Sequence, residues 1–177
     1  MDTHDDNQVD PTSATAWILG FGRSHIAVGE FEVLHILDQR PERFPIPQTP
    51  GHCREVILWE EQIVPLLDLT VLAEDSHGQH SRQDHGEGAA KQIVAIVGFQ
   101  SRANEVPGYG ALLLSKIPQR YTVQDDLASA FPSESPGLNR FTLCSFAHPE
   151  YGYVRVLDVP RLFAASARIA GKTYEAQ

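Results

Sequence analysis

The sequence predicts a mainly β protein made of two related β units, closed by one short helix near the C-terminus. Three observations predict this class. The apolar residues fall in short runs rich in β-branched side chains, which is typical of strands. Thirteen glycines and twelve prolines interrupt the 177 residues, which favours turns over long helices. A pattern of strand, aspartate and helical turn also occurs twice along the chain.

Residues 1–15 carry four aspartates and neither lysine nor arginine. Such a segment buries too little apolar surface to offset its ordering entropy, so we expect a disordered acidic tail before Ala16. The runs Trp17–Phe21 and His25–Val28 predict two strands around a Gly-Arg-Ser turn. Residues 31–37 fit either a strand or a brief helical turn, because their apolar period is ambiguous.

The segment 41–51 contains four prolines and predicts an extended loop. After it, the runs Val56–Trp59 and Ile63–Leu67 flank the polar residues 60–62, which is the pattern of a hairpin with a short turn. Residues 74–90 are polar and show no periodicity, so they predict a long loop inserted between the two units.

The second half begins with Ile93–Phe99, a strongly β-branched run that predicts a strand. The runs Tyr109–Leu114 and Arg120–Val123 predict two more strands, and residues 125–139 predict a loop with a helical turn. A second hairpin is predicted across Ala-His-Pro-Glu, between the runs Arg140–Phe146 and Tyr151–Leu157.

One helix is predicted at the C-terminal end of the chain. Asp158 suits the N-cap, Pro160 lies near the first helical position, and Gly171 suits the C-terminal stop. The apolar residues of this segment recur on one face, so we expect the helix to pack against the sheet. We accordingly divide the chain into a tail (1–15), a folded domain (16–165), and the end of the helix with a second tail (166–177).

The repeated pattern relates VPLLDLTVLA (64–73) to VRVLDVPRLF (154–163), 90 positions later. Asp68 and Asp158 occupy the same place in the two copies. There a carboxylate can accept backbone N–H groups as the chain turns from strand to helix. Matching triplets open the strands of the two halves: Leu19-Gly20-Phe21 and Val97-Gly98-Phe99.

The charge and the cysteines exclude several classes of protein. A net charge of −9 disfavours binding to nucleic acid or to anionic membrane surfaces, since phosphate recognition needs positive charge. No apolar run approaches the ~18 residues that span a bilayer, so we expect no membrane insertion. The N-terminus lacks the basic and apolar regions of a secretory signal. We therefore expect a cytoplasmic protein in which Cys53 and Cys144 are free thiols.

No residue pattern reaches the strength of a catalytic or metal site. The chain lacks the G-x-S-x-G, P-loop and H-E-x-x-H motifs. The histidines of the polar loop, His77, His80 and His85, have no frame to hold them around a metal, so a solvated linker is favoured over weak metal binding. Cys53 follows His52, but neighbours in a strand point to opposite faces, which argues against a catalytic pair. We expect no enzymatic activity and no cofactor.

The segment FPIPQTPGHCREVILWEEQIVPLLDL (44–69) resembles the central signature of CheW-like domains. In that family a proline-rich loop leads to a pattern close to G-V-I-N-L-R-G-x-I-V-P-V-I-D-L. Val56-Ile57 match its first apolar pair, and Ile63-Val64-Pro65 with Asp68-Leu69 match its close. The resemblance extends over residues 16–165. The signature residues that carry it are Pro65, Asp68 and Asp158.

The resemblance implies two small five-stranded β-barrels joined side by side. It also implies a non-catalytic signalling adaptor that couples methyl-accepting chemoreceptors to a CheA-type histidine kinase, in chemotaxis or in type IV pilus twitching motility. The resemblance implies no cofactor. The alternative is a degenerate CheW-like module that binds a different protein partner.

The chain departs from the family at one turn, where N-L-R-G is replaced by Leu58-Trp59-Glu60-Glu61. A basic residue and a glycine have both become glutamates. Like charges across an interface are costly, so this change predicts an altered choice of partner. We predict a protein-interaction site at Trp59, Glu60, Glu61 and Gln62. For Trp59, core packing stays open as the alternative, because strand alternation places it on the face of Ile57.

Overall fold

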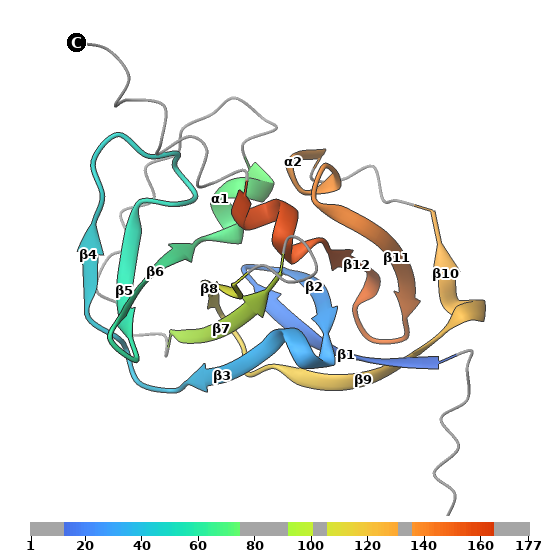
Figure 1. Cartoon of the computed structure of the whole chain (residues 1–177). Helices are drawn as coiled ribbons and strands as arrows, with labels where there is room; N and C mark the ends of the chain where they lie inside the picture. Colours follow the sequence, from blue (N-terminus) through green and yellow to red (C-terminus); the bar gives the residue numbers. More distant parts are fainter. Residues whose placement is uncertain (1–12, 75–91, 101–105, 131–135, 165–177) are drawn as a thin grey trace, which may run out of the picture.

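The computed structural model describes residues 13–74, 92–100, 106–130 and 136–164. Within them the chain forms two sheets of six strands, and short helices lie near their junction (Figure 1). The first sheet contains, in spatial order, β10 (Ala128–Ser129), β11 (Thr142–His148), β12 (Gly152–Leu157), β2 (Ser24–Gly29), β1 (Ser13–Phe21) and β9 (Gln119–Gln124). The second sheet contains β3 (Val33–Leu37), β7 (Ile93–Phe99), β8 (Gly108–Leu114), β6 (Gln62–Leu67), β5 (Glu55–Trp59) and β4 (Arg43–Pro45).

The described residues hold five short helical segments, of which four lie between strands and one follows the last strand. They are η1 (Glu30–Glu32), α1 (Leu69–Glu74), η3 (Asp125–Leu127), α2 (Pro136–Asn139) and a C-terminal helix over 159–164. The mainly β class and the two-unit architecture are therefore confirmed, with six strands in each sheet in place of the expected five.

The two sheets repeat one another position by position. Each is built on an antiparallel hairpin, β1–β2 or β7–β8, with an edge strand, β9 or β3, on its outer side. On the inner side a second hairpin joins in parallel, through β12 or β6. Leu66 pairs with Ala111 in one sheet, and Val156 pairs with Ala27 in the other. Since positions 66 and 156 are equivalent in the sequence repeat, the repeat is also one of strand register.

Each sheet takes strands from both halves of the chain. After the hairpin β1–β2 the chain crosses at η1, and β3 pairs with β7 of the second half. In return, β9 pairs with β1 of the first half. The two units are therefore interleaved by strand exchange, and are not two consecutive halves as the sequence repeat alone suggested.

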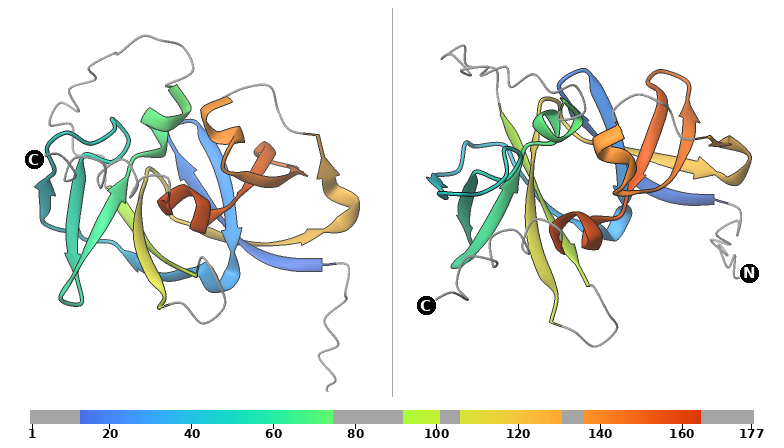
Figure 2. Two further views of the ribbon diagram at one scale, coloured as in Figure 1. Left: turned by 45° about the horizontal axis from the view of Figure 1, so that its top comes forward. Right: turned by 90° about the horizontal axis from the view of Figure 1, so that it is seen from above.

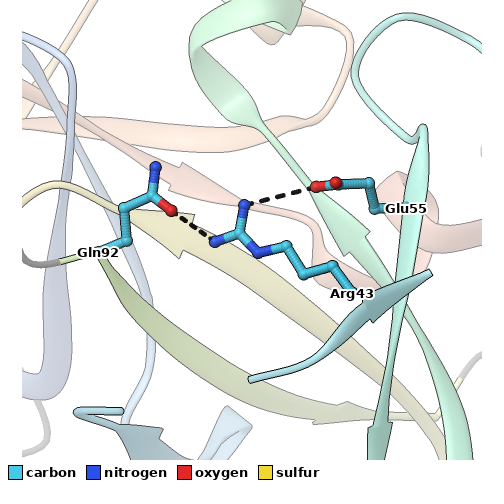
Figure 3. Close-up of polar contacts among 3 residues, drawn as sticks. All are labelled: Arg43, Glu55 and Gln92. Carbon is cyan, nitrogen blue, oxygen red and sulfur yellow. Dashed lines mark hydrogen bonds and ion pairs between the residues drawn. The ribbon is translucent and has the colours of Figure 1, made fainter. Parts of the chain in front are cut away.

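The edge strands of each sheet follow one another along the chain, so each sheet curls on itself (Figures 1 and 2). Arg43 of β4 reaches across the second sheet to Gln92, the residue that precedes β7 (Figure 3). Its Nη2 donates to Gln92 Oε1 at 2.7 Å, and its Nη1 contacts Glu55 Oε2 at 3.4 Å. The guanidinium thereby ties the short edge strand to the start of β7.

Three apolar clusters form the core. The cluster inside the first sheet includes Ile18 and Phe146, and the cluster inside the second includes Ile57 and Ile96. The largest cluster lies between the sheets and combines residues of both with residues of the helical segments. Its members from α1 and from the C-terminal helix are Leu69, Leu72, Val159, Leu162 and Phe163. This shared cluster makes the two sheets one packed body.

Several element bounds differ from the sequence predictions. β1 begins at Ser13 and not near Ala16, because residues 13–15 pair with β9. Residues 31–37 combine both expectations, since a helical turn at η1 leads into β3. The proline-rich segment 41–51 holds the edge strand β4, where Pro45 can be the last residue because an edge strand leaves N–H groups unpaired. The predicted loop 125–139 holds η3, β10 and α2.

Other predictions lie partly or wholly outside the described residues. These include the acidic residues 1–12, Gly171, and the whole of 166–177. Of the polar insert 74–90, only Glu74 is described, and it ends α1. The C-terminal helix is described as far as residue 164 and begins directly after Asp158, as predicted.

Candidate protein-interaction site

The hairpin β5–β6 carries the predicted interaction residues. Its strands pair in register from Glu55 with Leu66 to Trp59 with Gln62, which leaves Glu60 and Glu61 as a two-residue turn. Both turn residues have positive φ, 47° and 64°, which is the geometry of a type I′ turn. Gln62 belongs to β6 and not to the turn that the sequence suggested.

The acidic turn, Glu60-Glu61, holds two non-glycine residues in the left-handed region. That conformation costs on the order of 1 kcal/mol or more per residue, and the turn type normally selects Asn-Gly. Both side chains are exposed. In the described part of the chain no hydrogen bond or ion pair links either carboxylate to the rest of the protein. Two residues with a strained backbone and unpaired carboxylates, at an exposed hairpin tip, favour a role in recognition over a role in folding.

Trp59 lies on the inner face of β5, on the same side as the buried Ile57. Its ring packs against Tyr109 of β8, with centroids 5.5 Å apart and planes tilted by 59°. The residue is only half-buried, because it lies at the open end of the sheet beside the turn. The core contact that the sequence left open is therefore present, and the residue directly precedes the exposed turn.

The outer face of this hairpin is apolar and exposed, a feature that is not among the sequence predictions. Leu58 and Ile63 are cross-strand partners and are 59% and 76% exposed. Phe44 of β4, 42% exposed, is the cross-strand partner of Val56. We call these three residues, with the half-buried Val56 and Pro65, the hairpin face. An apolar surface of this kind beside charged residues is typical of a protein-interaction site.

A signal for the hairpin face was present in the sequence. A strand with one solvated face alternates apolar and polar residues, but Val56 and Leu58 are as apolar as their inward neighbours Ile57 and Trp59. Such a run predicts either burial on both faces or a face that a partner covers. Among the described residues none covers this face closely enough to bury Leu58, so it is the outer face of β5 that stays open.

The three signature residues support the local backbone structure, one in a strand and two at the start of a helix. Pro65 lies opposite Val56, and the pairing of β6 with β8 begins only at Leu66, so the missing N–H interrupts no central ladder. Asp68 Oδ1 accepts the Thr70 N–H at 2.9 Å, and Asp158 Oδ1 accepts the Arg161 N–H at 3.0 Å. Both aspartates thus cap the first turn of the helix that follows them.

The remaining chemical candidates do not form a reactive site. Cys53 is buried, and burial raises the pKa of its thiol, which disfavours a nucleophilic thiolate beside His52. Among the described residues, no group of three or more His, Cys, Asp or Glu could hold a metal ion. The loop histidines His77, His80 and His85 lie outside the described residues.

Comparison with solved structures decides the fold. The chain superposes on the crystal structure of the scaffolding protein TtCheW from Thermoanaerobacter tengcongensis with a TM-score of 0.62. The match covers 85% of this chain and 87% of that one, at 13% sequence identity. This chain has the CheW-like fold. No protein-family model matches the sequence, and no curated protein matches it either.

The CheW-like fold accounts for the two interleaved sheets and places the acidic turn at one end of the second sheet. At 13% identity the likeness concerns the backbone and not the surface, so the surface must be interpreted from this chain's own residues. Within the described ranges no helix is long and apolar enough to cross a membrane.

Proposed function

We propose that this protein is a non-catalytic signalling adaptor that binds a CheA-type histidine kinase and a methyl-accepting chemoreceptor. The observation that supports the proposal most is the exposed hairpin face on a CheW-like fold. Leu58 and Ile63 present a paired apolar surface that has no covering element in the described chain. Protein interfaces take their binding energy from a few such apolar residues, with polar residues at the rim.

The acidic turn provides such a rim. Glu60 and Glu61 stand next to Leu58 and Ile63, at the point where a basic residue and a glycine occur in CheW-like sequences. An acidic rim repels partners that carry acidic residues at this place and favours partners that carry lysine or arginine. The proposed kinase and receptor are therefore the dedicated partners of this chain, acting in the cytoplasm in chemotaxis or type IV pilus motility.

Binding measurements on purified proteins test the adaptor role. The kinase and receptor fragments encoded in the same genome are immobilised, and the full chain is titrated over them. We expect Leu58→Glu and Ile63→Glu each to weaken binding about 10-fold or more, because each buries a charge in the apolar contact. The matched control is Leu143→Glu, at an exposed leucine of the equivalent hairpin. The proposal is contradicted if both variants bind as tightly as the parent chain. It is also contradicted if the parent chain binds neither fragment.

The acidic turn also supports a second candidate, a CheW-like module with a partner outside the receptor array. The double variant Glu60→Arg with Glu61→Gly restores the charge and the glycine of the family turn. If the parent chain binds neither kinase nor receptor while the double variant binds one of them, the second candidate is correct. If the parent chain binds and the double variant loses affinity, the acidic turn is part of a working adaptor interface.

A further inference from the structure

A lysine is fixed at the junction of the two sheets, away from the hairpin face. Lys116 follows β8, and its aliphatic stem lies on the backbone of Gly20, where a Cβ would come within 3.2 Å of the Lys116 Cβ and Cδ. The preceding residue anchors it, since the Ser115 N–H donates to Gly20 O at 2.9 Å. Ser115 Oγ also lies 3.3 Å from the same oxygen. The stem of the exposed Lys116 side chain thus packs on Gly20, next to the hydrogen bonds of Ser115.

The ammonium points at a histidine and not at a carboxylate. Lys116 Nζ lies 3.4 Å from His25 Nε2 and 6.0 Å from the centroid of the Tyr151 ring. An ammonium has no acceptor, so the contact is a hydrogen bond only when Nε2 is unprotonated and His25 is neutral. Across the described residues, no carboxylate lies within ion-pair distance of Lys116.

Aromatic stacking fixes the position of His25. Its ring stacks on Tyr151 at 3.9 Å, and His148 stacks on the opposite side of Tyr151 at 4.5 Å. The Tyr151 hydroxyl donates to Gln119 Oε1 at 3.2 Å. His148 is fixed in turn, since its Nδ1 accepts the backbone N–H groups of Glu150 and Tyr151. The two nitrogens, Lys116 Nζ and His25 Nε2, therefore sit in a preformed geometry.

A notch of about 30 Å³ opens beside these nitrogens. Ile18, the Tyr151 ring and the 72% exposed Ile117 supply apolar walls, and Lys116 with His25 supplies the polar end. The volume accommodates on the order of two water-sized groups, which suits the two oxygens of a carboxylate. We propose that this notch is a proton-linked binding site for a carboxylate, of the kind carried by an Asp or Glu side chain flanked by apolar residues.

The charges around His25 set the direction of the proton linkage. Burial, and then the positive charge of Lys116, lowers the pKa of His25, while Glu150 acts in the opposite direction and His148 adds to the lowering. A carboxylate placed between Lys116 and His25 replaces the Lys–His hydrogen bond and stabilises the imidazolium. His25 then takes up one proton from solvent and donates it in a hydrogen bond to the bound oxygen. Binding strengthens as pH falls from about 8 to about 6, where a carboxylate remains ionised.

Nuclear magnetic resonance titration of the full chain tests the site. The probes are the blocked peptides acetyl-Ile-Glu-Ile-amide and acetyl-Ile-Gln-Ile-amide, sodium acetate, and inorganic phosphate. We expect the Glu peptide to give saturable chemical-shift changes at the His25 ring and at residues 115–119, and to raise the pKa of His25. Its affinity should be several-fold weaker at about pH 8 than at about pH 6. The Gln peptide should give none of these effects. Saturation by acetate at equal affinity identifies a free small carboxylate as the ligand source.

Three variants separate the site from general surface charge. Lys116→Met keeps the stem on Gly20. It should lower the affinity for the Glu peptide about 10-fold, because a charge-assisted hydrogen bond is removed. Glu150→Gln removes a carboxylate that raises the pKa of His25, so it should move the strengthening of Glu-peptide binding to lower pH. Gly20→Ala keeps every charge but displaces the Lys116 stem, so it should weaken binding less than Lys116→Met. Equal binding by the parent chain and Lys116→Met, or tighter binding of phosphate than of either carboxylate, overturns the proposal.

Discussion

The hairpins β5–β6 and β11–β12 occupy equivalent places in the two sheets, yet their tips differ. The first ends in the two-residue acidic turn, which projects from the sheet. The second has a longer turn, and its Tyr151 is sandwiched between His25 of β2 and His148 of β11. The same strand pattern thus yields one tip that is docked on its own sheet and one that is available to a partner. Both hairpins expose apolar side chains, which in the second are Leu143 and Tyr153, so it is the free acidic tip that makes the first the stronger candidate for recognition.

The largest effects on the free energy of unfolding should come from equivalent core positions. These positions test whether the two halves of the repeat contribute equally to stability. Leu67 and Leu157 end β6 and β12, and they are 0% and 1% exposed in the same cluster. We expect Leu67→Ala and Leu157→Ala each to lower the free energy of unfolding by about 2–5 kcal/mol. Urea denaturation measures both losses. A loss confined to one variant shows that only one half of the repeat supports the shared core.

Glycine should be favoured in both turns, so adding it to the first and removing it from the second should change the free energy of unfolding with opposite signs. In the acidic turn, Glu60→Asn with Glu61→Gly relieves two positive-φ residues and should raise the free energy of unfolding by about 1 kcal/mol. In the second hairpin, Gly152 has φ 70° with open space around it, so Gly152→Ala should lower it by about 1 kcal/mol through backbone strain alone. Urea midpoints of the two variants check the signs. If Glu60→Asn with Glu61→Gly leaves the free energy of unfolding unchanged, the positive-φ residues of the acidic turn do not strain the backbone.

The two aspartate caps should contribute equally. Asp68→Ala and Asp158→Ala each remove one acceptor for a backbone N–H and should each cost about 1 kcal/mol. Asp68→Asn and Asp158→Asn keep an acceptor and serve as matched controls with smaller losses. Thermal denaturation compares the four variants. An alanine variant as stable as the parent chain shows that the corresponding cap is replaced by another hydrogen bond.

The smallest effect should be a pH dependence of the stability, which comes from His25 beside the docked hairpin. Burial lowers the pKa of His25 from 6.5, so the folded chain binds fewer protons at this site than the unfolded chain. The resulting stability is complete above 6.5 and is lost as pH falls towards the folded pKa. Replacing His25 with Gln removes this part of the pH dependence, which urea midpoints at about pH 8 and about pH 5.5 measure. An unchanged pH dependence in His25→Gln would falsify the assignment.

The local patterns of the chain were sufficient for the longer strands and for the caps, but not for the short edge strands β4 and β10. The runs 56–59 and 63–67 predicted their hairpin because a short polar turn between apolar runs has few alternatives. The aspartates at 68 and 158 predicted helix starts because their carboxylates act on residues two or three positions away. Alternation also placed Trp59 correctly beside Ile57 on the inner face.

Long-range features were not predictable in the same way. The exchange of β3 and β9 between the sheets depends on which edge each strand meets, and no local pattern encodes that choice. The exposure of Leu58 and Ile63 depends on which elements pack over the outer face of their hairpin, and among the described residues none buries them. The contact of Lys116 with His25 joins residues 91 positions apart.

By itself the sequence determined the mainly β class, the repeated strand–aspartate–helix unit and the acidic turn at Glu60-Glu61, because these depend on hydrogen bonds and alternation between near neighbours. Only the tertiary structure decided which of the two equivalent hairpins stays free and which is docked. That outcome depends on residues contributed by the other strands. His25 lies beside the tip of β11–β12 and stacks on it, whereas the tip of β5–β6 has no such partner in the described chain. The free tip and the fixed lysine are therefore properties of the packing and not of the strand pattern.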